Sequence, residues 1–148
     1  ELVSTKYGKE EKLNLVYQTE CKDGNLYRIR PPFIPKEIAH FHTILLESSL
    51  NSTFTSEHEF LLAFNNRNRI AGGLYWRKID SKKIHLEWVA IRQKYQKISL
   101  SNRLMSDFFK RKKHQGIHTI TVGFYAEKFF FKQGFKIDKQ FGGLVKRI

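Results

Sequence analysis

Short runs in which hydrophobic residues alternate with polar ones recur along the chain, and this alternation predicts half-buried β-strands. The first run, LYRIR, stops at Pro31 and Pro32 because proline cannot donate a hydrogen bond to a strand ladder. Three further runs lie close together and are separated only by polar turns: EFLLAF, RIAGGLYWRKI and IHLEWVAI, at 59–64, 69–79 and 84–91. Such short turns predict antiparallel neighbours in one sheet.

Two segments have the three- and four-residue spacing of amphipathic helices. Pro35 suits a first helical turn, and the apolar residues after it predict a helix over 35–50. Thr55 to Glu59 is expected to hold a short capped turn. After the polar loop RQKYQKIS, a second helix is predicted from about Ser101 to Gln115, with Gly116 at its C-cap.

The C-terminal part adds a strand in HTITVGF, a short helix in AEKFFFKQ and a terminal hairpin from FKID and GLVKRI. The order of elements predicts an α/β fold, with a mixed, mostly antiparallel central sheet flanked by helices. A length of 148 residues favours one domain. We place that domain at 27–148 and treat 1–26, which is polar and lysine-rich, as an N-terminal extension able to add an edge strand.

The net charge and the single cysteine limit the classes of function that the sequence allows. Lysine and arginine number 27 against 14 acidic residues, so the formal net charge is +13 and an anionic partner is expected. Charge alone leaves nucleic acid, an acidic protein, an anionic membrane surface, a polyphosphate cofactor and simple solubility open. Cys21 has no second cysteine to pair with, and no membrane span or signal segment is recognisable. An intracellular protein, cytoplasmic or nuclear, is therefore expected. Because the first residue is Glu1, a longer parent chain is an open possibility.

A strand, a polar loop and a helix follow one another in VAIRQKYQKISLSNRLM, at 89–105. The unpaired N–H groups and positive dipole at a helix N-terminus favour an anion such as a pyrophosphate. Every strand, loop and helix unit has such an end, so a purely structural role is the competing interpretation. Lys110 to His114 offer a second group of cations, which could grip phosphate or simply stabilise a helix C-terminus.

The loop in this unit resembles the pyrophosphate loop Q/R-x-x-G-x-G/A of the GNAT superfamily of acetyl-CoA-dependent acyltransferases. Gln96 fits, whereas Ser99 and Ser101 stand where the family prefers glycine or alanine, so the loop is a degenerate form. Serine tolerates positive φ poorly, which predicts a strained loop and a lower affinity for the cofactor. The resemblance implies that acetyl-CoA contacts Gln96, Lys97, Ile98, Ser99, Leu100, Ser101 and Asn102.

AEKFFFKQGF, at 126–135, is similar to the family's last helix, A-x-x-F-Y-x-x-x-G-F. Phe130 occupies the place where many members carry a tyrosine that protonates the departing thiolate. The histone acetyltransferase branch commonly has phenylalanine there too, and the resemblance puts Phe130 at the cofactor. The competing interpretation is a helix that only packs in the core. Tyr125 lies one turn earlier and is expected to be a poor substitute for the missing tyrosine.

The resemblance covers about 27–148 and also implies a bulge in the strand at 84–91. Such a bulge splays the strand from its neighbour, so that the pantetheine arm of acetyl-CoA pairs with the main chain of Val89 and Ile91. One N–H there would polarise the thioester carbonyl.

A protonated amine cannot attack a thioester, so transfer needs a base. His85 and Glu87 are two residues apart on one strand and should share a face, with Leu86 and Trp88 on the other. We favour Glu87 as the base, with His85 as second choice. The alternative is that both only line a polar face. No histidine has ligand spacing with acids or cysteine, so no metal is predicted.

The function predicted from these features is N-acetyl transfer, by direct transfer from acetyl-CoA to an amine on a protein or other macromolecule. A surface of charge +13 repels lysine-rich tails, so an acceptor on nucleic acid or on an acidic protein is at least as plausible. The alternative is a catalytically inactive GNAT-like module that binds acetyl-CoA, nucleic acid or a partner protein. No membrane partner is expected.

Overall fold

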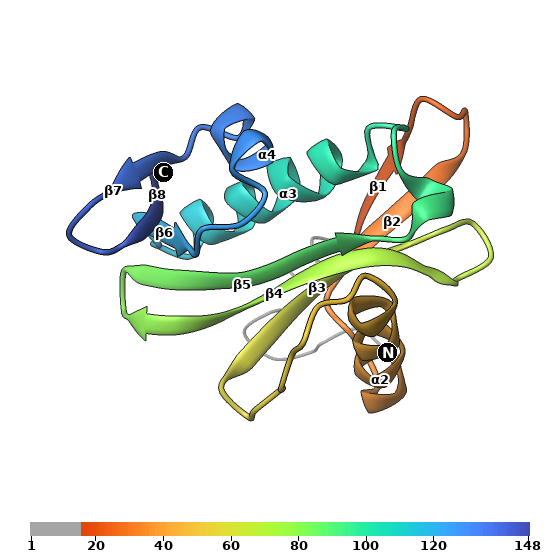
Figure 1. Cartoon of the computed structure of the whole chain (residues 1–148). Helices are drawn as coiled ribbons and strands as arrows, with labels where there is room; N and C mark the ends of the chain where they lie inside the picture. Colours follow the sequence, from red (N-terminus) through yellow and green to blue (C-terminus); the bar gives the residue numbers. More distant parts are fainter. Residues whose placement is uncertain (1–15) are drawn as a thin grey trace.

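The computed structural model describes residues 16–148 and contains one eight-stranded sheet (Figure 1). The strand order is β1-β2-β3-β4-β5-β6-β8-β7, in which β5 and β6 are parallel and all other neighbours are antiparallel. The predicted fold class, a mixed and mostly antiparallel sheet flanked by helices, is confirmed. The strands are β1 (Tyr17–Glu20), β2 (Leu26–Arg30), β3 (His58–Phe64), β4 (Ile70–Asp80), β5 (Lys83–Ile91), β6 (Thr119–Val122), β7 (Lys136–Asp138) and β8 (Gly143–Arg147).

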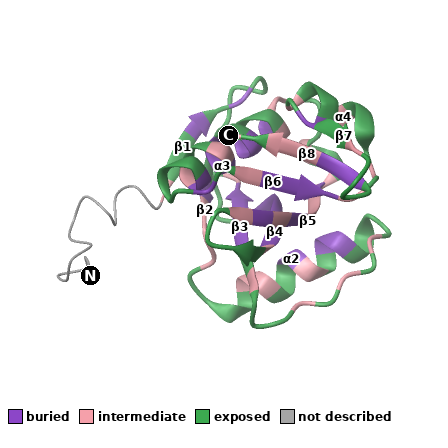
Figure 2. Cartoon of the chain, turned by 90° about the vertical axis from the view of Figure 1, so that its left-hand side faces the viewer, coloured by how far each residue is buried: buried purple, intermediate pink, exposed green. Residues whose placement is uncertain are grey.

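Helices cover both faces of the sheet (Figures 1 and 2). Helix α2 (Pro35–Glu47) lies on one face, and α3 (Leu100–His114) and α4 (Glu127–Lys132) lie on the other. Alternate side chains of each strand point to opposite faces, so the sheet separates two apolar cores. Both long helices were predicted, but α2 ends three residues earlier than expected because Ser49 takes a positive φ of 60°.

The N-terminal region supplies the edge strand that its sequence allowed, since β1 pairs with β2 along its whole length. Residues 1–15 of the predicted extension lie outside the described residues, so the domain boundary near residue 26 stays a prediction. The cations near the end of α3 lie in its last turn, where they complement the helix dipole. Within 16–148, no helix is both long and apolar enough to cross a membrane.

Strand β5 contains the predicted bulge. Opposite it on β4, Tyr75 pairs with Trp88 and Trp76 pairs with Leu86, which leaves Glu87 as an extra residue. The parallel pairing of β5 with β6 also stops at Leu86, so the two strands separate beyond this point.

The bulge corrects one sequence-based prediction. Leu86 and Trp88 were expected on the same face, but Leu86 belongs to the core under α3 whereas Trp88 packs against the core under α2. A simple two-residue period fails because the inserted residue reverses the alternation of the residues that follow it.

Close contact between β4 and β5 depends on Gly72, near the start of β4. A Cβ on Gly72 would lie 2.5 Å from the carbonyl oxygen of Ala90 and 2.9 Å from Cα of Ile91, and both of these atoms are backbone. Residue 72 therefore has to be glycine if β5 is to keep its place beside β4.

We expect Gly72→Ala to destabilise the fold by about 1–3 kcal/mol, because the added methyl pushes against backbone that cannot rotate away. Gly123→Ala is the matched control, since a Cβ there meets nothing within 4 Å. Urea unfolding curves of both variants check the prediction, and equal midpoints would contradict it.

Candidate functional site

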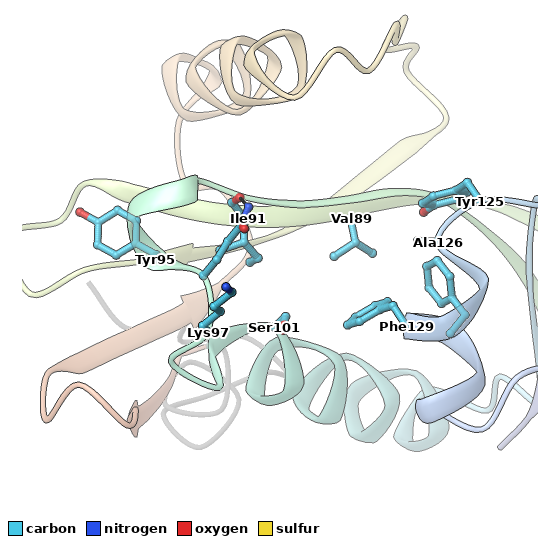
Figure 3. Close-up of a pocket in the computed structure, with 10 residues that line it drawn as sticks. Val89, Ile91, Tyr95, Lys97, Ser101, Tyr125, Ala126 and Phe129 are labelled. Carbon is cyan, nitrogen blue, oxygen red and sulfur yellow. Dashed lines mark hydrogen bonds between the residues drawn. The ribbon is translucent and has the colours of Figure 1, made fainter.

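A cavity of about 310 Å³ lies where β5 separates from β6, between β5, α3 and α4 (Figure 3). Val89 and Ile91 point into it from β5, Ser101 faces it from the first turn of α3, and Phe129 closes it from α4. The remaining lining residues are Tyr95, Gln96, Lys97, Tyr125, Ala126 and Phe130. The cavity is therefore an elongated slot with a helix N-terminus at one end and aromatic side chains at the other.

The structure gathers most of the residues predicted to contact a cofactor around this cavity: Val89, Ile91, Gln96, Lys97, Ser101 and Phe130. Phe130 is fully buried, and its ring packs edge-on against Tyr125 and Phe135. Phe130 therefore belongs to the core and also borders the cavity, and its contact with a cofactor stays a prediction.

The other four predicted contacts do not line the cavity. Leu100 is buried in the core and Ile98 packs against it. Asn102 is exposed and accepts a hydrogen bond from Gln133 Nε2 at 2.9 Å. Ser99 is the N-cap of α3, and its hydroxyl is buried without a hydrogen-bond partner. These residues can still offer main-chain N–H groups or set the conformation of the loop. Neither role requires their side chains to line the cavity.

The loop before α3 has the strained backbone that was predicted at Ser99, whereas Ser101 lies in the first turn of α3 and is not strained. Ser99 has a φ of 72° and Lys97 a φ of 64°, the left-handed region that favours glycine. Surrounding contacts hold this conformation. The Gln96 side chain donates to the Ile91 carbonyl oxygen at 2.9 Å, and the Lys22 N–H donates to the Ile98 carbonyl oxygen at 2.9 Å. Lys22 belongs to the turn between β1 and β2, so this turn helps to hold the loop in place.

Glu87, favoured as the base, is held by two donors on the α2 side of the sheet. Arg77 Nε and His58 Nε2 each lie 3.0 Å from its Oε2. The Thr55 backbone N–H donates to His58 Nδ1, so a neutral His58 carries its proton on Nε2 and donates it to Glu87. The second carboxylate oxygen, Oε1, lies 3.7 Å from His85 Nε2. Glu87 and His85 therefore do share a face, as predicted.

His85 is oriented by the neighbouring strand. Its Nδ1 lies 2.8 Å from the Thr121 hydroxyl, which itself donates to the Ile84 carbonyl oxygen at 3.4 Å. The hydroxyl therefore accepts from Nδ1–H, which leaves the lone pair on Nε2 beside Glu87. Burial lowers the pKa of His85, Glu87 acts in the opposite direction, and Arg77 lowers it further. A neutral imidazole with a free Nε2 can accept a proton, and the carboxylate beside it stabilises the cation that results.

Sequence reasoning missed several residues of this site. His58 and Arg77 belong to β3 and β4, and only the pairing of these strands brings them to Glu87. Tyr125 was not among the residues predicted to contact the cofactor, but its side chain lines the cavity. No periodicity marks these positions, since each contact depends on the packing of separate elements. Within 16–148, no group of three or more His, Cys, Asp or Glu side chains is arranged to hold a metal ion.

Comparison with known proteins agrees with this geometry. The family described as acetyltransferase (GNAT) domain matches residues 29–141, which is most of the chain. The chain belongs to the GNAT acetyltransferase family. Among curated proteins, none is similar enough to count as a match.

Solved GNAT structures share the fold at low sequence identity. The GNAT domain of S. lividans PAT has a TM-score of 0.71 at 13% identity, with 90% of this chain and 97% of that one covered. Escherichia coli YhbS, solved in complex with CoA, has a TM-score of 0.64 at 14% identity, covering 80% and 79%. An Elizabethkingia anophelis acetyltransferase with acetyl-CoA bound has a TM-score of 0.55 at 19% identity, covering 76% and 77%.

We expect Ser99→Gly to stabilise this GNAT domain by about 1 kcal/mol, because glycine adopts the left-handed conformation without steric cost. Ser99→Ala serves as the control, since it also removes the unpartnered hydroxyl but keeps the Cβ. Thermal unfolding of the three proteins checks the prediction. An equal gain in both variants would attribute the effect to the hydroxyl and contradict a backbone origin.

Proposed function

We propose that this protein is an N-acetyltransferase that passes the acetyl group of acetyl-CoA directly to an amine. The observation that carries the proposal is the slot at the bulge, which exposes the main chain of β5 beyond Leu86 where pairing with β6 has ended. An extended amide-bearing chain can pair with such a free strand edge. The family assignment and the solved neighbours with CoA or acetyl-CoA bound support this choice of donor.

The residues around the slot suit the parts of acetyl-CoA. The loop at 96–101 and the first turn of α3 offer unpaired N–H groups for the pyrophosphate, and Lys97 adds a positive charge. Val89 and Ile91 border the middle of the slot, where the pantetheine arm would lie. When bound, acetyl-CoA supplies an activated thioester. The strained backbone of the loop belongs to the fold itself, so the strain at Ser99 lowers the stability of the fold and leaves the slot able to bind.

The proton-accepting role falls to the pair of His85 and Glu87. We assign His85 Nε2 as the atom that takes the proton from the acceptor ammonium, because its lone pair is free while Glu87 Oε2 already accepts from Arg77 and His58. Glu87 then stabilises the imidazolium through Oε1. Both residues lie on the face opposite the slot, so the amine is expected to approach from the α2 side and reach the thioester where the strands part.

The acceptor we propose is an amine on a macromolecule. The similarity of AEKFFFKQGF to the histone acetyltransferase branch supports a protein amine, while the net charge of +13 favours an acceptor with anionic surroundings. A lysine or N-terminal amine beside an acidic segment is both a protein amine and one with anionic surroundings. An amine carried on nucleic acid has the anionic surroundings only.

Isothermal titration with acetyl-CoA tests the proposal. We expect wild-type protein to bind and Ser101→Glu to bind at least about tenfold more weakly, because Ser101 lines the slot at the first turn of α3 and the new carboxylate would lie beside the pyrophosphate. Ser106→Glu adds the same charge on the exposed side of α3 and is expected to bind like wild type. Failure of wild-type protein to bind acetyl-CoA would overturn the proposal and favour an inactive module.

The pair of His85 and Glu87 is testable without knowing the acceptor. NMR titration should place the pKa of His85 below the ordinary value of about 6.5, since burial disfavours the cation. Glu87→Gln removes a charge that raises the pKa of His85, so this pKa should fall further. The neutral imidazole of His85 should then persist to a lower pH than in wild-type protein. Glu59→Gln, on the exposed side of β3, is the control for loss of charge. An unchanged His85 titration in Glu87→Gln would contradict the pairing.

A further inference from the structure

We infer that the Tyr125 hydroxyl is a hydrogen-bond donor to the acyl oxygen of the bound thioester, acting beside the main-chain N–H of Val89. This inference rests on the proposed function and adds a residue to it. The donor comes from the connection between β6 and α4, and not from α4 itself, where Phe130 offers no hydroxyl.

The first observation is that the Tyr125 hydroxyl is buried and has no hydrogen-bond partner, although the side chain lines the slot. A buried polar group left unpaired is costly and uncommon in folded proteins. A donor that faces a cavity and lacks an acceptor is accounted for when an acceptor atom of a ligand enters that cavity.

The second observation is the position of the ring at the point where the two faces of the sheet meet. Tyr125 packs against Trp88, with ring centroids 4.3 Å apart, and edge-on against Phe130 at 5.2 Å. Trp88 packs against the core under α2, whereas Phe130 belongs to the core under α3. Figure 3 shows Tyr125 at the end of the pocket opposite Tyr95. The hydroxyl is thus held at the gap where the amine and the thioester have to meet.

The third observation is the neighbouring main chain of the bulge. The Arg92 N–H donates to the Ala71 carbonyl oxygen, and the regular pairing that follows makes Leu74 and Val89 a non-hydrogen-bonded pair, so the Val89 N–H points away from β4 towards the free edge of β5. Val89 and Tyr125 both line the slot, beyond the point where the pairing of β5 with β6 has ended. Two donors that converge on one point form the arrangement that stabilises developing negative charge on an acyl oxygen.

The surroundings also keep the phenol protonated. Burial is the largest influence on Tyr125 and raises its pKa, and the charge of Glu87 acts in the same direction. The hydroxyl therefore donates a hydrogen bond without giving up its proton, so no proton has to be returned to Tyr125 during turnover.

Infrared spectroscopy of bound [1-¹³C]acetyl-CoA tests this inference, because hydrogen bonds to a carbonyl oxygen lower its stretching frequency. We expect the stretching frequency of the ¹³C-labelled carbonyl to be lower on wild-type protein than in water. In Tyr125→Phe this frequency should move back upward. Tyr95→Phe is the matched control, since Tyr95 lines the same slot but its hydroxyl already accepts from Asn65 Nδ2 at 2.8 Å. Whatever that control does to affinity, its carbonyl band should match that of wild type.

Affinity supplies a second measurement. Tyr125→Phe should reduce the preference for acetyl-CoA over CoA by about three- to tenfold, the effect of one hydrogen bond, because CoA has no acyl oxygen. An unshifted band in Tyr125→Phe, on protein that still binds acetyl-CoA, would overturn the role of Tyr125 and leave the proposed function intact. Absence of acetyl-CoA binding by wild-type protein would instead remove the proposed function itself.

Discussion

One extra residue in β5 determines how the candidate site is built. Glu87 has no partner of its own on β4, and the alternation of side chains reverses at this point. His85 and Glu87 therefore face the α2 side, while Val89 and Ile91, further along the same strand, face the slot under α3 and α4. Without the bulge, a two-residue period would place Glu87 and Val89 on the same face. The proposed proton-accepting pair and the proposed cofactor slot would then lie on the same side of the sheet.

Several of the unfavourable features of the described residues lie at the site, although Ser49, Ser52 and Asn68 show similar ones elsewhere. Positive φ at Lys97 and Ser99, a buried unpaired hydroxyl at Ser99 and another at Tyr125 all occur at the two ends of one slot. Each costs free energy in the isolated protein, and two apolar cores on opposite faces of the sheet offset that cost. Strained backbone and unpaired polar groups are often found at functional sites, so their presence around the slot agrees with a binding role.

The two faces of the sheet carry different sets of charged groups. On the slot side the positive contributions are Lys97 and the dipole of α3, which suit a polyphosphate. On the other side Arg77 and His58 hold one carboxylate oxygen of Glu87 and leave the other near His85. The sheet keeps these charges apart, and the gap between β5 and β6 is the place where groups on its two faces can come into contact.

Sequence by itself determined the alternating strands, the two long helices and the mixed, mostly antiparallel α/β class, because these depend on local periodicity and on proline and glycine positions. It also located the loop at 96–101 and the segment at 126–135 through their order along the chain. Only the tertiary structure decided which side chains meet. His58 and Arg77 reach Glu87 through strand pairing, and Trp88 changes face because of the bulge. Tyr125 lines the slot and packs edge-on against Phe130 of α4 and against Trp88 of β5. Contacts of this kind join residues far apart in sequence, and no local pattern encodes them.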